Sequence, residues 1–186
     1  MEKQNKNSFY HDEDFADIIV VNGEDVTLSY EGESSVRHVY VKFLGDSPLN
    51  WQDYANEYNE EDNWISLDQE KSKRMTVELV QAIEDSGVSS FLFSFEKWGE
   101  GHFLSGDFAG GWAALYYEDS DENINYSPHN ASYDTVEILA PVYIGGQSPV
   151  PKRFALDDMS LVARIAAHFL EIGQLCPGTQ WVKEIG

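Results

Sequence analysis

Residues 89–95 read SSFLFSF and residues 156–172 read LDDMSLVARIAAHFLEI, and the contrast between these two stretches decides the fold class. In the first, Phe91, Phe93 and Phe95 alternate with other residues, which is the period of two expected of a strand. In the second, apolar residues recur at the spacing of one helix face, and Gly173 follows as a C-terminal cap. Strands and helices are therefore both present and are separate along the chain.

The same helical spacing predicts a second main helix over residues 69–86, with Gly87 as its stop. Apolar or alternating runs between turn residues predict further strands at 15–21, 25–30, 36–44, 110–117, 124–126, 135–144 and 179–185. The first three are expected to form an antiparallel meander, and residues 45–63 a surface loop. This pattern is typical of an α+β fold. We expect a mostly antiparallel sheet with two main helices, in one domain over residues 15–186 that follows a flexible segment at residues 1–14.

The charge of the chain is its most informative feature for function. It has 33 Asp and Glu against 12 Lys and Arg, a formal net charge of −21 over 186 residues. A hydrophobic content of 42% indicates that the chain folds rather than behaving as a disordered acidic tail. So large a negative field repels nucleic acid and attracts basic surfaces. We therefore expect a basic protein partner, and neither nucleic acid nor a membrane.

Acidic residues concentrate in two regions. Residues 98–151 contain no Lys or Arg, and residues 53–62 interleave carboxylates with aromatic residues. Aromatic rings supply desolvated contact area, while carboxylates pair with Arg and Lys and steer the encounter. The candidate partner-binding residues are Asp53, Tyr54, Glu57, Tyr58, Glu60, Glu61, Asp62, Trp64, Tyr117, Glu118, Asp119, Asp121 and Glu122.

Motifs for catalysis or metal binding are incomplete in this sequence. The run from Gly146 to Val150 fails the G-x-S-x-G nucleophile pattern at its last position, and the five histidines lack metal-ligand spacing. Residues 119–123 match the first positions of a calcium loop, but Ile124 and Asn130 replace the required glycine and glutamate. We predict a solvated acidic loop there, with no catalytic residue, metal or cofactor.

The cellular compartment is predicted from cysteine use and hydropathy. Cys176 is the single cysteine, which excludes an internal disulfide and suits a reducing compartment. No apolar run approaches the roughly 20 residues that a membrane-spanning helix needs, and residues 1–10 are polar. The expected location is the cytoplasm.

The carboxy-terminal half carries an ordered set of small, proline and aromatic residues. The set consists of Gly145-Gly146, Val150-Pro151, Ala166, Phe169, Leu170, Gly173, Pro177 and Trp181, with Gly110-Gly111-Trp112-Ala113-Ala114-Leu115-Tyr116 upstream. Over roughly residues 91–182 the chain resembles the immunity-protein family that is often associated with deaminase toxins in bacterial polymorphic and contact-dependent inhibition systems. The resemblance implies a small cytoplasmic α+β protein that binds a cognate toxin domain, and it transfers scaffold positions rather than functional residues.

Charge and resemblance together predict an immunity protein. It would neutralise a basic toxin domain, such as a nucleic-acid-targeting deaminase or nuclease, in a 1:1 complex that covers the active site or substrate groove. Two alternatives stay open at this point. One is an acidic mimic of nucleic acid that binds a host DNA-binding protein, and the other is a hydrolase that uses two carboxylates with raised pKa values.

Overall fold

The computed structural model describes residues 17–20, 38–45, 49–59, 63–97, 101–135 and 138–185. Its main feature is a nine-stranded antiparallel sheet. The strands are β1 (Asp17–Val20), β2 (Val39–Phe43), β3 (Glu57–Asn59), β4 (Trp64–Leu67), β5 (Ser90–Ser94), β6 (Phe103–Ala109), β7 (Trp112–Asp119), β8 (Ile124–Pro128) and β11 (Gln180–Ile185). Their order across the sheet is β1-β11-β8-β7-β6-β5-β2-β4-β3.

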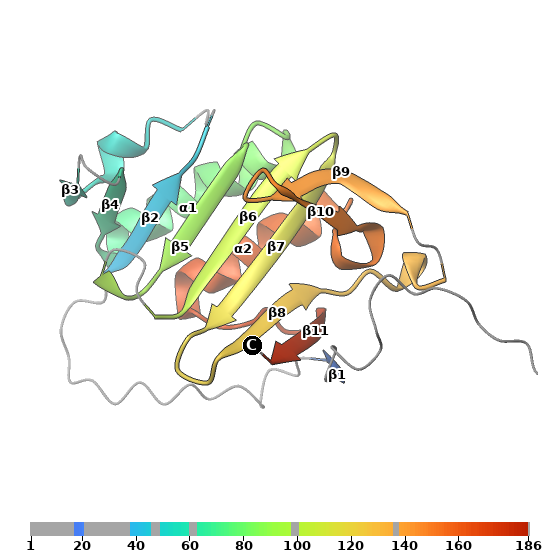
Figure 1. The fold of residues 1–186 in the computed structure, drawn as a ribbon. Coiled ribbons are helices and arrows are strands. Elements are labelled where there is room, and N and C mark those ends of the chain that lie inside the picture. The colour runs from blue at the N-terminus through green and yellow to red at the C-terminus, as the bar shows by residue number, and fades with distance from the viewer. Residues whose placement is uncertain are drawn as a thin grey trace, which may run out of the picture.

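Two helices lie side by side on one face of this sheet (Figure 1). Helix α1 spans Gln69–Glu84 and helix α2 spans Met159–Ile172. The predicted α+β class, with two main helices against an antiparallel sheet, is confirmed. A short hairpin of β9 (Leu139–Ile144) and β10 (Ser148–Pro151) packs over β6 and β7 on the other face. We call that second face the open face.

Local capping explains where the helices begin. Asp68 and Asp158 each accept a hydrogen bond from a backbone N–H in the first turn, at 2.9 Å and 3.1 Å, as N-cap residues do. Helix α2 begins at Met159 rather than at the predicted Leu156. Leu156 is unavailable to the helix because it exchanges two backbone hydrogen bonds with Ala113 of β7, at 2.8 Å and 2.9 Å.

Helix α2 ends where the sequence predicts, at a left-handed glycine. Gly173 has φ of 76°, and its N–H donates to the Phe169 carbonyl oxygen at 2.7 Å. We expect Gly173→Ala to lower the free energy of unfolding by about 1 kcal/mol, because a Cβ disfavours this backbone region. Urea denaturation would measure the loss. The control is Gly87→Ala, at an exposed glycine outside the left-handed region, which should cost nothing. Equal midpoints for the two variants would contradict the prediction.

The main core lies between the sheet and the helices. Phe91 and Phe93 stack with ring centroids 4.1 Å apart, and Phe169 of α2 packs edge-on against Tyr117 at 5.9 Å. A smaller cluster on the open face joins Ala114 of β7 to Ala140 and to other residues of the hairpin region. Alternate residues of β7 therefore serve two different cores, one on each face of the sheet.

The structure corrects the predicted amino-terminal meander. Strand β1 pairs with β11, so it lies at the opposite edge of the sheet from β3 and far from β2. The predicted strand at residues 25–30 lies outside the described residues. Residues 45–63 are not all loop, since they include a short 3-10 helix, η1 (Trp51–Tyr54), and the edge strand β3. Loop-like acidic composition is compatible with an edge strand that pairs on one side only.

Two strands, β6 and β10, were not predicted because they contain residues that are typical of turns. Strand β6 contains Gly106, a residue type that favours turns, in the middle of the strand. A Cβ at Gly106 would lie 2.7 Å from Phe91 Cζ and 2.9 Å from Leu115 Cδ2, so only glycine fits this position. Strand β10 contains two prolines, which are tolerated because β10 is the edge of a two-stranded sheet. In the described ranges, no helix is both long and apolar enough to cross a membrane.

Candidate partner-binding surface

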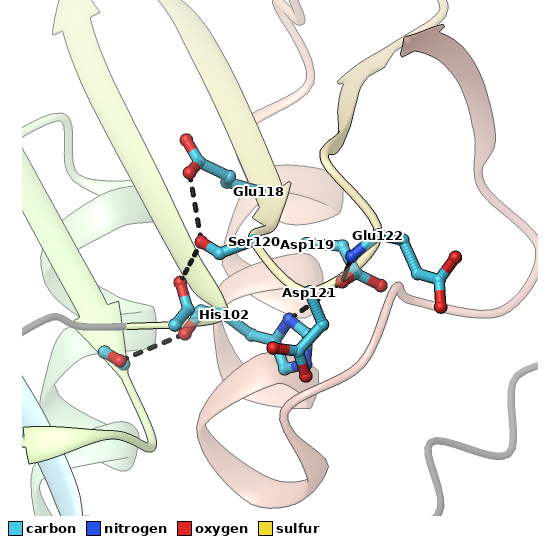
Figure 2. Close-up of polar contacts among 8 residues, drawn as sticks. His102, Glu118, Asp119, Ser120, Asp121 and Glu122 are labelled. Carbon is cyan, nitrogen blue, oxygen red and sulfur yellow. Dashed lines mark hydrogen bonds and ion pairs between the residues drawn. The ribbon is translucent and has the colours of Figure 1, made fainter. Parts of the chain in front are cut away.

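Of the four acidic residues predicted in residues 118–122, Glu118 and Asp119 end β7, while Asp121 and Glu122 lie in the turn between β7 and β8. The Asp119 carboxylate accepts a hydrogen bond from the Glu122 backbone N–H at 3.1 Å. The Ser120 hydroxyl lies 2.8 Å from the Gly101 carbonyl oxygen and 3.0 Å from Glu118 Oε1, and its single proton is shared between them (Figure 2). These contacts tie the turn to itself and to the segment that precedes β6.

His102 lies beneath this turn. Its Nδ1 is 3.3 Å from Asp119 Oδ1 and its Nε2 is 3.5 Å from Asp121 Oδ2 (Figure 2). The Nδ1 contact is not aligned as a hydrogen bond, so we interpret it as an electrostatic contact. The two carboxylates differ in exposure: the Asp119 side chain is 11% exposed and the Asp121 side chain is 81% exposed. Asp119 therefore fixes the turn, while Asp121 and the exposed Glu122 face solvent.

This geometry also bears on the calcium-loop resemblance of the turn. Asp119, the first candidate ligand, is directed at His102 and at a backbone N–H. Among the residues that the structure describes, no group of three or more His, Cys, Asp and Glu side chains could hold a metal ion. The described turn thus offers two solvated carboxylates on a fixed backbone.

The second predicted region lies at the other edge of the sheet. Asp53, Glu57 and Tyr58 are exposed, and the Tyr58 hydroxyl donates to Asn63 Oδ1 at 3.0 Å. Glu60, Glu61 and Asp62 lie outside the described residues.

Three of the predicted aromatic anchors are buried, so their assignment to a contact surface is wrong for this structure. Tyr54, Trp64 and Tyr117 are 7%, 6% and 3% exposed. Large rings add more to stability inside the core than on the surface. Tyr54 packs beneath Arg74 of α1, and a hydrogen bond to Glu78 followed by burial raises the pKa of its phenol. Tyr58 is the one predicted aromatic residue that remains on the surface.

The fold does not bring the two predicted regions together. Strand β3 is five positions from β7 in the sheet order. With neighbouring strands about 4.8 Å apart, the two regions are separated by about 24 Å across the sheet. A partner that contacted both would have to cover the sheet between them.

The open face contains acidic and aromatic residues that the sequence reasoning did not select. Strand register aligns Phe103 with Glu118, Glu118 with Asn125, and Asn125 with Glu184, in one row across β6, β7, β8 and β11. All four side chains are half-buried. We call these four residues the open-face row. The signal in the sequence was the period of two in β6 and β7, which places residues 103, 116 and 118 on one face.

Tyr116 lies beside the open-face row, with its ring centroid 6.2 Å from that of Phe103. Burial, followed by the charges of Glu118 and Glu184, raises the pKa of the Tyr116 phenol to about 12. Burial also raises the pKa of the Glu184 carboxyl. The row is therefore acidic and partly desolvated.

A pocket of about 360 Å³ between the two helices and β2 is a different kind of site. Its lining mixes apolar residues such as Val39 and Leu170 with Lys73, and its one carboxylate is Glu171. Glu184, the carboxyl with the raised pKa, lies across the sheet on the open face. This pocket therefore does not hold the two carboxylates that a hydrolase mechanism would use.

No family model matches this sequence, and no match is found among curated proteins.

Proposed function

We propose that this protein is a cytoplasmic immunity protein that binds a basic toxin domain in a 1:1 complex and blocks it without catalysis. The observation that carries the proposal is the run of residues 98–151, which contains many carboxylates but no Lys or Arg. Asp121 and Glu122 are exposed at the β7–β8 turn, and Glu118 lies next to them on the open face. The toxin class proposed is a nucleic-acid-targeting deaminase or nuclease.

The mechanism is occlusion of the surface that receives phosphates in the toxin. Enzymes that act on nucleic acid bind its backbone with Lys and Arg, so a matching array of carboxylates competes for the same groups. The contacts of Asp119 and Ser120 hold the β7–β8 turn in place before binding. A turn that is already ordered loses less conformational entropy when the partner arrives, and this favours a high-affinity complex.

The test is an affinity pull-down of the tagged protein from its native cell lysate, with identification of the bound proteins at low and high salt. Recovery of one basic, toxin-like polypeptide supports the proposal, and co-expression should then suppress its toxicity. Recovery of a host DNA-binding protein would favour the mimic of nucleic acid instead. If no basic polypeptide is retained at low salt, the proposal is wrong.

A further inference from the structure

We propose that the open-face row, with Tyr116 beside it, is a docking site for an arginine side chain of a basic protein partner. The kind of partner rests on the proposed function, but the site is argued from its own geometry. Among the described elements, the β9–β10 hairpin packs over β6 and β7, and the 2.9 Å hydrogen bond from Gly145 N–H to Asp107 fixes its turn to the sheet. Asp107 lies four residues along β6 from Phe103, so the row lies away from this anchor point.

The row has the charge that a cation requires. Glu118 and Glu184 flank Asn125 on adjacent strands and project to the same side of the sheet. They lie two strands apart, which corresponds to about 9.6 Å across the sheet. A cation placed between these two half-buried carboxylates would be attracted by both.

Arginine fits this row better than lysine because the row is also aromatic. Phe103 and Tyr116 present paired rings beside the carboxylates, with centroids 6.2 Å apart. A guanidinium is planar, stacks on an aromatic face and donates hydrogen bonds to carboxylates in a fork. Asn125 adds an amide oxygen that can accept a further hydrogen bond from the same group. A lysine ammonium would balance the charge, but it could neither stack on the rings nor donate two parallel hydrogen bonds to a carboxylate.

The free protein should be less stable with this row than without its charges. The raised pKa of Glu184 means that the folded protein holds this proton more tightly than the unfolded chain does. Stability from this group is therefore present at low pH and is lost as the pH rises through the folded-state pKa. We expect the double variant Glu118→Gln with Glu184→Gln to melt at a higher temperature than the wild type at neutral pH. The difference should shrink below the ordinary pKa range of glutamate.

A binding assay separates a docking role from a structural one. The probe is a fluorescein-labelled peptide of alternating glycine and arginine, measured by fluorescence anisotropy beside the same peptide with lysine. We expect the double variant to bind the arginine peptide about tenfold more weakly, while it melts at a higher temperature. The control, Glu70→Gln with Glu171→Gln, removes two exposed charges on the helices and should change affinity less than twofold. The lysine peptide should bind more weakly to the wild type.

Equal weakening by the two double variants would overturn the docking site, because it would show binding to net charge alone. Equal affinity of the wild type for the two peptides would overturn the preference for arginine. The pull-down with the same variants keeps the two proposals apart. The docking site is contradicted, and the proposed function stands, if the wild type and the Glu118 and Glu184 variant retain the same amount of a basic polypeptide. If the wild type retains no basic polypeptide while the peptide assay still separates the two double variants, the proposed function is wrong and the docking site stands.

Discussion

Replacing Trp181 by alanine is expected to lower the free energy of unfolding by about 3–5 kcal/mol, the largest loss that we predict for a single side chain. Trp181 is 0% exposed and lies in β11, where it pairs with Pro128 of β8 on one side and Ile19 of β1 on the other. Its removal leaves a cavity in the main core between the sheet and the helices. The measurement is urea denaturation followed by circular dichroism.

A second substitution at the same position serves as the control. The Trp181 indole N–H is buried and has no hydrogen-bond partner among the described residues, which is unfavourable in the core. Trp181→Phe keeps much of the apolar volume and removes that N–H, so it should lose less than half as much stability as Trp181→Ala. A loss below about 1 kcal/mol for the alanine variant would show that β11 contributes little to the core.

Reversing the charge at Asp121 and Glu122 together, as Asp121→Lys with Glu122→Lys, is expected to slow association with the basic partner by about 10- to 100-fold at low salt. Both residues are exposed on a turn whose backbone is fixed by other groups, so the fold should survive the change. The dissociation rate should change less, because exposed charges act mainly on the encounter. Stopped-flow or surface-binding kinetics with the partner recovered by pull-down would measure both rates.

The matched control reverses Glu70 and Glu171, which are exposed on the helices. It changes the net charge by the same amount on the other side of the sheet. The effect of the turn variant should also fall as salt is added, because the Debye length decreases to about 8 Å at physiological ionic strength. If the two double variants slow association equally, the turn is not part of the contact surface.

Much of the local structure could be predicted because it depends on neighbours in the sequence. The helical spacing from Met75 to Ile83 predicted α1, and Gly173 marked the end of α2. Boundaries failed where a distant segment competed, as at Leu156, whose backbone groups bond to β7. Strand β6 was not predicted because glycine is typical of turns. Gly106 is instead required in mid-strand because the ring of Phe91 leaves no room for a Cβ.

The candidate site was predicted in part. The sequence located the acidic turn, and Asp121 and Glu122 are exposed there. It could not separate Asp119 from its neighbours, because the contacts with His102 and with the Glu122 backbone N–H make Asp119 a structural group. It also ranked Tyr54 and Tyr117 as contact residues from their acidic surroundings, whereas both are buried. Composition near a residue says little about which way its side chain points.

The sequence by itself determined the α+β class, the two helices, the net charge of −21 and the absence of Lys and Arg from residues 98–151. These are properties of composition and short-range periodicity, which are set within a few residues. Only the tertiary structure decided which carboxylates are solvated, and that Glu118, Asn125 and Glu184 form one row. The physical reason is strand pairing: antiparallel register joins residues that are nearly 60 positions apart, and no local pattern records which strands become neighbours.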